Sequence, residues 1–172
     1  MNKTILGFIA LLGLASVASA ANPYMGFSAG YLLDGKDPLF CTRLGFELAR
    51  QEKLTHSVEA EIGITRSTDY GITLDVVPIM ANYRLGIELA PKLSLDIGGG
   101  LGMTWNRLKY YGSSSDVAFA YQLFTGLNFS VNEKTSLCAG VRYIDIGEAT
   151  LSGITAELGD DVSLELGVKF KF

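Results

Sequence analysis

The chain has 172 residues, of which 14 are basic and 18 acidic, and its formal net charge is −4 at pH 7. This length suits one domain, and an acidic balance without a basic stripe excludes nucleic acid as a partner. Glycine is abundant, with 20 residues, whereas proline occurs only 4 times, and 48% of the residues are hydrophobic.

The first 20 residues have the pattern of a cleavable secretory signal: Lys3, an apolar run over residues 5–17, and the A-x-A ending Ala18-Ser19-Ala20. The run is too short for a spanning helix, which needs about 20 apolar residues. The residue after the cut is Ala21 rather than cysteine, so a lipid-anchored lipoprotein is not expected. We predict a signal peptide over residues 1–20 and one domain over residues 21–172; a retained N-terminal anchor is the alternative.

Eight segments of alternating polarity follow, and they predict eight strands. They cover residues 24–32, 39–49, 57–65, 76–87, 93–105, 117–131, 135–144 and 162–172. Each has ~9–15 residues, close to the 9–11 of a tilted membrane strand. Pro78 is awkward inside a central strand, and a bulge there would accommodate it.

The connections between these segments alternate in length. Tight polar turns are expected at residues 51–53, 91–92 and 132–134, and the other linkers cover residues 33–38, 66–71, 106–116 and 147–161. Short turns at one end and longer loops at the other are typical of outer-membrane barrels, whose short turns face the periplasm.

One face of every segment is apolar and free of charge, and the other face is polar. The polar face carries Arg43, Glu47, Glu59, Glu61, Arg84, Asp96, Arg142, Glu165, Lys169 and Lys171. Aromatic residues collect near both ends of the segments, as in the interfacial girdles of membrane barrels. No later segment is long enough for a membrane helix, so a membrane-spanning chain must form a closed barrel. A lipocalin-like barrel and a β-sandwich are the soluble alternatives.

The last eight residues, 165–172, read polar-x-Gly-x-x-aromatic-x-aromatic through Glu165, Gly167, Phe170 and Phe172. This resembles the carboxy-terminal sorting signal of bacterial outer-membrane barrels, and with the eight segments the chain resembles the small OmpA/OmpX-type and opacity-protein-like barrels. The resemblance implies an eight-stranded antiparallel transmembrane up-and-down β-barrel in the outer membrane of a Gram-negative bacterium. It also implies recognition by the barrel-assembly machinery and contact with outer-membrane lipid and lipopolysaccharide. The alternative is that the two phenylalanines end an ordinary edge strand.

Eight strands leave an interior that side chains can fill, and buried charges need partners. We therefore predict a charge network in the lumen, composed of Arg43, Glu47, Glu59, Glu61, Arg84, Asp96, Arg142, Glu165 and Lys169. The network is expected to act as a structural plug, and a narrow ion pore is the alternative.

A lipid-modifying enzyme is the rival class, because such barrels use a Ser, a His and an acidic residue. The one histidine, His56, lies near a predicted periplasmic turn, and its neighbour Ser57 should point to the opposite face. We expect an exposed turn residue and no catalytic residues, cofactor or metal site. Cys41 and Cys138 should differ in height by ~15 Å, too far apart for a disulfide, which predicts free buried thiols.

The longer linkers carry whatever specificity the protein has. Arg107, Lys109, Tyr110 and Tyr111 form a candidate contact with a partner or with lipopolysaccharide phosphates, the alternative being an ordinary solvated loop. The expected function is a non-enzymatic structural or surface-exposed membrane protein, whose loops would mediate adhesion or host contact by resemblance to the family.

Overall fold

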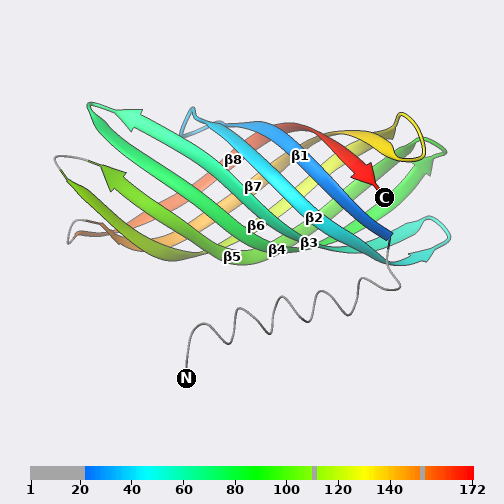
Figure 1. Ribbon diagram of the computed structural model, residues 1–172, viewed down its shortest axis with the longest axis horizontal. Helices are drawn as coiled ribbons and strands as arrows, with labels where there is room; N and C mark the ends of the chain where they lie inside the picture. The colour runs from blue at the N-terminus through cyan, green and yellow to red at the C-terminus, as the bar shows by residue number, and fades with distance from the viewer. Residues whose placement is uncertain (1–21, 110–111, 152–153) are drawn as a thin grey trace, which may run out of the picture.

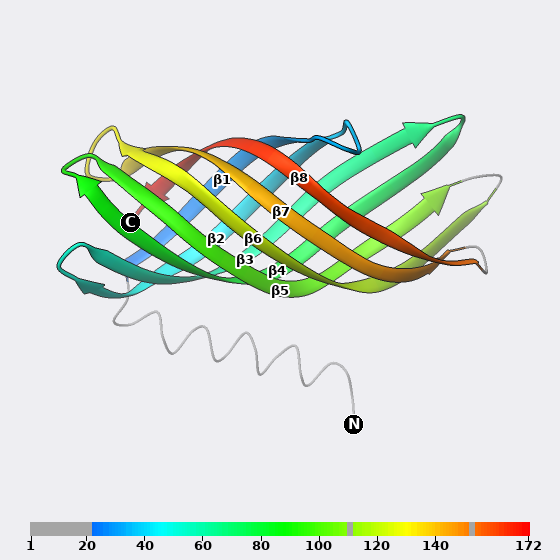
Figure 2. The same cartoon turned by 180° about the vertical axis from the view of Figure 1, so that it is seen from behind.

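The computed structural model describes residues 22–109, 112–151 and 154–172, and these form a closed barrel of eight antiparallel strands (Figures 1 and 2). Every strand pairs with its neighbours in sequence, and β8 closes the ring by pairing with β1. The strands are β1 (Asn22–Leu32), β2 (Pro38–Gln51), β3 (Leu54–Asp69), β4 (Ile72–Ala90), β5 (Leu93–Lys109), β6 (Ser113–Ser130), β7 (Thr135–Leu151) and β8 (Ile154–Lys171). The predicted eight-stranded antiparallel up-and-down fold is confirmed.

The described residues contain no helix that is long and apolar enough to span a membrane. The predicted signal peptide, residues 1–20, lies outside the described residues.

The strands are longer than predicted at the end away from the termini. The predicted loops 66–71, 106–116 and 147–161 are wrong as loops, because strand pairing continues through most of each range, to Asp69↔Ile72, Lys109↔Ser113 and Leu151↔Ile154. Backbone pairing needs only an extended chain, so it continues beyond the point where the regular alternation of polar and apolar side chains ends. The strands were predicted from that alternation. The three hairpins β3–β4, β5–β6 and β7–β8 therefore project beyond the β1–β2 turn (Figures 1 and 2).

Pro78 does not cause the bulge that would have accommodated it. The β3–β4 register is the same on both sides of it, with Ile62 opposite Ile79 and Thr65 opposite Val76. Proline lacks an N–H, so a ladder bond is lost there without insertion of a residue. The register shifts of the barrel occur instead near the short turns, at Glu47/Ala49 and at Glu88/Ala90.

The two faces of the barrel wall are opposite to those of a water-soluble protein. The exposed side chains include a broad set of large hydrophobic residues, whereas Glu59, Glu61, Asp96 and Arg142 are buried inside. The exposed aromatic residues lie toward both strand ends, among them Tyr31, Phe40, Trp105, Phe119, Tyr83, Phe129 and Phe170. Such an apolar belt between aromatic girdles fits the hydrocarbon layer of a membrane.

This polarity reverses in the projecting hairpins. Their inward face is apolar: Ala118, Ala149 and Leu151 form a buried cluster, against which Leu74, Leu108, Ile146 and Leu158 pack. On the outward face Arg66, Asp75 and Arg107 lie side by side across β3, β4 and β5. Water on the outside and apolar side chains within are what a strand needs once it has left the lipid.

β1 begins and β8 ends at the same end of the barrel, where Tyr24 lies opposite Lys171. Both termini of an even-stranded outer-membrane barrel lie on the periplasmic side, with the short turns. We therefore assign the projecting hairpins to the extracellular side.

Candidate functional site

The narrow bore brings together charged side chains that are far apart in sequence. The β2–β3 register places Arg43 directly opposite Glu61, and the β4–β5 and β7–β8 registers place Asp96 and Glu165 opposite glycines, Gly86 and Gly140. Inward positions alternate along each strand, so each strand presents its charges at fixed heights. An eight-stranded interior is just wide enough for these side chains to meet across it.

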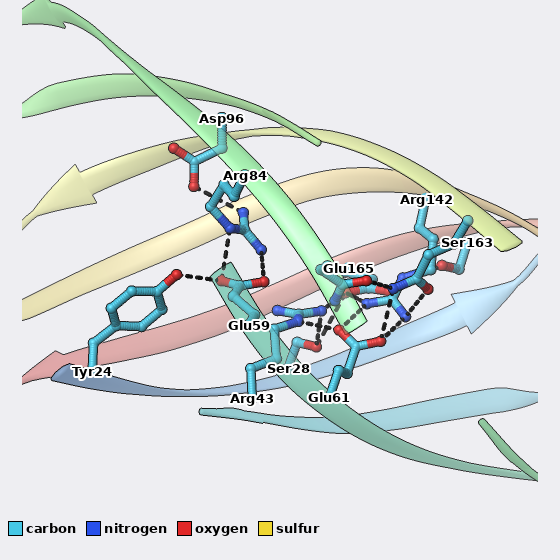
Figure 3. Close-up of polar contacts among 12 residues, drawn as sticks. Tyr24, Ser28, Arg43, Glu59, Glu61, Arg84, Asp96, Arg142, Ser163 and Glu165 are labelled. Carbon is cyan, nitrogen blue, oxygen red and sulfur yellow. Dashed lines mark hydrogen bonds and ion pairs between the residues drawn. The ribbon is translucent and has the colours of Figure 1, made fainter. Parts of the chain in front are cut away.

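Four of the predicted lumen residues form the central cluster of the bore (Figure 3). The Glu61 carboxylate, with 0% side-chain exposure, pairs with Arg43 Nε on one side and with Arg142 Nη1 at 2.5 Å on the other. Glu165 bridges the same two arginines, at 2.7 Å from Arg43 Nη2 and 2.7 Å from Arg142 Nε. The Ser28 hydroxyl accepts a hydrogen bond from Arg43 at 3.0 Å and donates one to Glu165 at 3.1 Å.

A second cluster lies nearer the periplasmic end. Arg84 donates to both oxygens of Glu59, at 2.8 and 2.9 Å, and pairs with Asp96 at 2.8 Å. The Tyr24 hydroxyl donates to Glu59 at 2.7 Å (Figure 3). Lys169 Nζ lies 3.6 Å from Asp96 and 5.0 Å from the centre of the Tyr24 ring.

The glycines of β5 make room for this cluster and its surroundings. A Cβ at Gly98 would collide with the Phe124 ring, and one at Gly100 with the Asn82 side chain. The Phe124 ring in turn lies 4.5 Å below the Arg84 guanidinium, a cation–π contact. The contact with Arg84 and the space at Gly98 allow the polar bore to accommodate the aromatic side chain of Phe124.

The ninth predicted residue, Glu47, lies apart from both clusters and pairs at 2.6 Å with Lys171 at the periplasmic rim. The neutral members Tyr24, Gln122 and Asn82 were not predicted. Gln122 accepts from Arg142 at 2.9 Å and donates to Asn82 at 2.7 Å. The alternation of the strands places these three side chains inward, but they carry no charge, and the prediction was based on charged residues alone.

The two clusters balance in charge. Arg43, Arg84, Arg142 and Lys169 face Glu59, Glu61, Asp96 and Glu165, and each has at least one ion pair. The Arg142 side chain is only 2% exposed and Gln122 is 1% exposed. The two cavities beside the network have volumes of about 50 and 120 Å³. Groups packed in this way occupy the bore and hold opposite walls together.

The other candidate residues lie where they do not combine into a catalytic group. The expectation that His56 is an exposed turn residue is wrong, because β3 begins at Leu54 and His56 lies half-buried on its outward face. Its Nδ1 lies 2.5 Å from the Tyr83 hydroxyl, while Ser57 is buried in the bore. Cys41 and Cys138 are free thiols, as predicted, but only Cys41 is fully buried and Cys138 is half-buried. In the described part of the chain no group of three or more His, Cys, Asp or Glu side chains could hold a metal ion.

The predicted partner-contact residues are only partly described. Arg107 and Lys109 lie in β5 rather than in a loop, and Lys109 Nζ pairs with Asp75 at 2.8 Å. Arg66 Nε pairs with the other oxygen of Asp75 at 2.5 Å. Tyr110 and Tyr111 lie outside the described residues.

A bore filled by paired charges, inside a wall with an apolar outer face, is the arrangement of a small barrel of the outer membrane. The sequence model of a protein family, described as the outer membrane protein β-barrel domain, matches residues 6–172. The chain belongs to this family. It is an integral protein of the Gram-negative outer membrane, and the predicted transmembrane fold and location are confirmed.

Solved structures share the fold at low sequence identity. The chain is similar to neisserial surface protein A, NspA, with 17% identity, a TM-score of 0.64 and coverage of 88% of this chain and 96% of that one. It is similar to Ail, the attachment invasion locus protein of Yersinia pestis, with 16% identity, a TM-score of 0.56 and coverage of 88% and 97%. It is also similar to the outer-membrane enzyme PagL, with 11% identity, a TM-score of 0.53 and coverage of 86% and 98%. No curated protein matches the chain.

The residues that resemble the family's sorting signal lie in β8, the strand that closes the barrel. Gly167 packs against Phe27 and Ser28 of β1, and Phe170 is exposed on the outward face. The Phe172 backbone N–H donates to the Pro23 carbonyl at 3.1 Å. Recognition of these residues by the barrel-assembly machinery stays a prediction.

Replacement of Glu61 by glutamine tests how strongly the central cluster holds the barrel. Glu61→Gln leaves Arg43 and Arg142 buried with Glu165 as their remaining carboxylate, and we expect the free energy of unfolding to fall by about 3–5 kcal/mol. Urea titration in lipid vesicles, followed by the fluorescence of the single tryptophan, Trp105, measures it.

The matched control is Glu47→Gln, which removes a carboxylate paired with a Lys171 side chain that is 36% exposed. Because this pair is at the rim, we expect a loss of about 0–1 kcal/mol. An equal loss of unfolding free energy in the two variants would show that water screens the charges at the centre of the bore. The bore would then not be filled by side chains.

Proposed function

We propose that the protein is a non-enzymatic surface protein, in which a plugged barrel carries extracellular hairpins that contact other molecules. The observation that carries this proposal is the paired network around Glu61, which occupies the bore at mid-height. A bore filled in this way supplies rigidity rather than passage. The surface available for function is then the set of hairpins outside the membrane.

The geometry of His56 supports the absence of hydrolase activity. Its ring contacts a tyrosine hydroxyl on the lipid-facing wall, and the adjacent Ser57 points into the bore, on the other side of the sheet. A nucleophile and its base must lie within hydrogen-bond reach of each other, and this serine and this histidine do not. The fold alone does not decide the point, since PagL is an enzyme with the same architecture.

Purified protein in planar bilayers and in a lipid-hydrolysis assay tests both alternatives at once. We expect no stable conductance steps and no release of fatty acid from phospholipid or lipopolysaccharide above that of empty membranes. Reproducible steps that disappear in a variant of the bore would establish a pore. Hydrolysis that His56→Ala abolishes would establish an enzyme.

The hairpin tips present the side chains best placed for adhesion or host contact. Tyr70, at the tip of the β3–β4 hairpin, is 95% exposed and has a φ of 47°, a left-handed conformation that few residues adopt readily. Exposed tyrosines are frequent anchors of protein interfaces because they bury a large area with few rotatable bonds. Ail, a structural neighbour, is named for attachment and invasion.

Replacement of Tyr70 by asparagine tests this contact, since asparagine tolerates a left-handed conformation and preserves the turn. We expect adhesion of bacteria expressing Tyr70→Asn to host cells to fall by about fivefold or more relative to bacteria expressing the wild type. The control is Glu52→Asn, at a periplasmic residue of similar conformation with a φ of 46°. Unchanged adhesion in the Tyr70 variant would remove this residue from the contact.

A second contact is proposed at the base of the same hairpins, with lipopolysaccharide phosphates. Arg66, Arg107 and Lys109 surround a single carboxylate, Asp75, on the outward face. Trp105, two residues below Arg107 on this face, is exposed at the level of the upper aromatic girdle. Excess positive charge just above a girdle lies at the depth of lipid headgroups, and each basic residue there contributes about 1 kcal/mol of attraction to an anionic surface.

The double variant Arg66→Gln/Arg107→Gln leaves the Lys109–Asp75 pair in place. We expect the affinity of the nanodisc-embedded barrel for lipopolysaccharide to fall by about fivefold for each charge removed, and to depend less on salt. The control Lys53→Gln/Lys92→Gln removes two charges from periplasmic turns. An equal loss of affinity in the control would show that net charge alone is responsible.

A further inference from the structure

The extracellular mouth of the barrel contains a cavity that the ion-pair network does not fill. Its volume is about 330 Å³, compared with about 50 and 120 Å³ for the two cavities lined by the charged part of the bore. Sites for small molecules begin at about 300 Å³. The mouth is therefore large enough for one small ligand.

The wall of this cavity is apolar, unlike the bore below it. Leu39, Leu74, Val76, Ile144 and Ile146 are among its lining residues. Leu39 and Pro78, which also lines the cavity, pack with Cys41 against Gly63. An apolar wall at the mouth of the barrel suits the apolar part of a ligand.

The rim of the cavity is acidic. Asp34, Asp37, Asp160 and Asp161 line it, and none of the described residues that line it is a lysine or arginine. Lys36 lies between Asp34 and Asp37 in the same turn but does not line the cavity. The Asp161 carboxylate accepts hydrogen bonds from the backbone N–H groups of Leu33, Asp34 and Gly35, at 3.0, 3.1 and 2.8 Å, and so fixes the β1–β2 turn at the mouth. Asp34, Asp37 and Asp160 form no ion pair with any described residue.

One polar atom in the wall has no partner in the described structure. The Thr65 hydroxyl oxygen is buried and forms no hydrogen bond with any described residue, although Thr65 lines the cavity. This oxygen has almost no accessible surface, so a ligand in the cavity does not reach it, and Thr65 lines the cavity through its other atoms.

We propose that this mouth binds a small amphiphilic cation. The alkyl or aryl part of the ligand lies against the apolar wall of the cavity, and its ammonium group lies beside Asp34, Asp37 and Asp160. An amphiphilic anion is disfavoured by the same carboxylates. This site goes beyond the proposed adhesion and lipopolysaccharide contacts, because it faces the inside of the mouth and they face outward.

The experiment is isothermal titration of the wild-type barrel in lipid nanodiscs with hexyltrimethylammonium, with empty nanodiscs as the blank. Hexyl sulfate and 1-hexanol have the same tail. Hexyl sulfate is negatively charged, and 1-hexanol is uncharged. We expect saturable binding of the cation at one site, and binding at least tenfold weaker for hexyl sulfate. No saturable heat above the blank, or equal binding of the anion, would overturn the proposal.

Two variants locate the site. Asp34→Asn/Asp37→Asn/Asp160→Asn should weaken binding of the cation at least tenfold, and Ser67→Trp should abolish it by filling the cavity that Ser67 lines. The matched control, Glu52→Gln/Glu133→Gln/Glu148→Gln, removes three carboxylates elsewhere and should leave binding unchanged. The heat-dependent gel shift of a closed barrel verifies that each variant is folded. Full binding by both site variants, or an equal loss in the control, would place the cation elsewhere.

Discussion

The structure depends on the closure of β8 onto β1. A strand edge in lipid exposes N–H and C=O groups that nothing in the hydrocarbon can satisfy, and each costs several kcal/mol. The ladder from Tyr24↔Lys171 to Leu32↔Ser163 removes that edge and makes the sheet a ring. Once the ring is closed with eight strands, its radius is set, and so is the distance across which inward side chains must find one another.

The charges of the bore follow from this radius. The Glu61 side chain has 0% exposure, and it cannot turn toward lipid, so its charge must be balanced by neighbouring side chains. The narrow interior offers it two arginines from different strands, Arg43 and Arg142, and the same two arginines are bridged a second time by Glu165. Opposite walls are thereby connected by ion pairs. A network of this kind is compatible with a rigid support and poorly compatible with transport, which is why the proposed functions lie at the extracellular end.

The surroundings change where the strands leave the membrane, and the side chains change with them. Above the girdle marked by Trp105 the outward face carries Arg66, Asp75 and Arg107, while the inward face becomes apolar around Leu74 and Ile146. One continuous sheet thus has an inverted section in lipid and a conventional section in water. The conventional section creates a hollow with an apolar wall and an acidic rim, in contrast to the filled bore below it. In the functions proposed above, the section in lipid is the plug and the section in water is the binding surface.

The sequence by itself determined the number of strands, the face that each presents to lipid and the set of charges that must lie inside, because alternation with a period of two is a local property of the chain. It also indicated free cysteines and a histidine remote from any catalytic partner.

Only the tertiary structure decided which carboxylate meets which arginine, since Glu61 and Arg142 become neighbours through barrel closure and not through spacing. The hairpin extensions and the apolar mouth were not predicted for a related reason. Their strands continue where the polar and apolar faces exchange sides, and in the sequence this exchange looks like the end of a strand. Gln122 and Asn82 became visible only as the neutral members of a network whose charged members the sequence had already named.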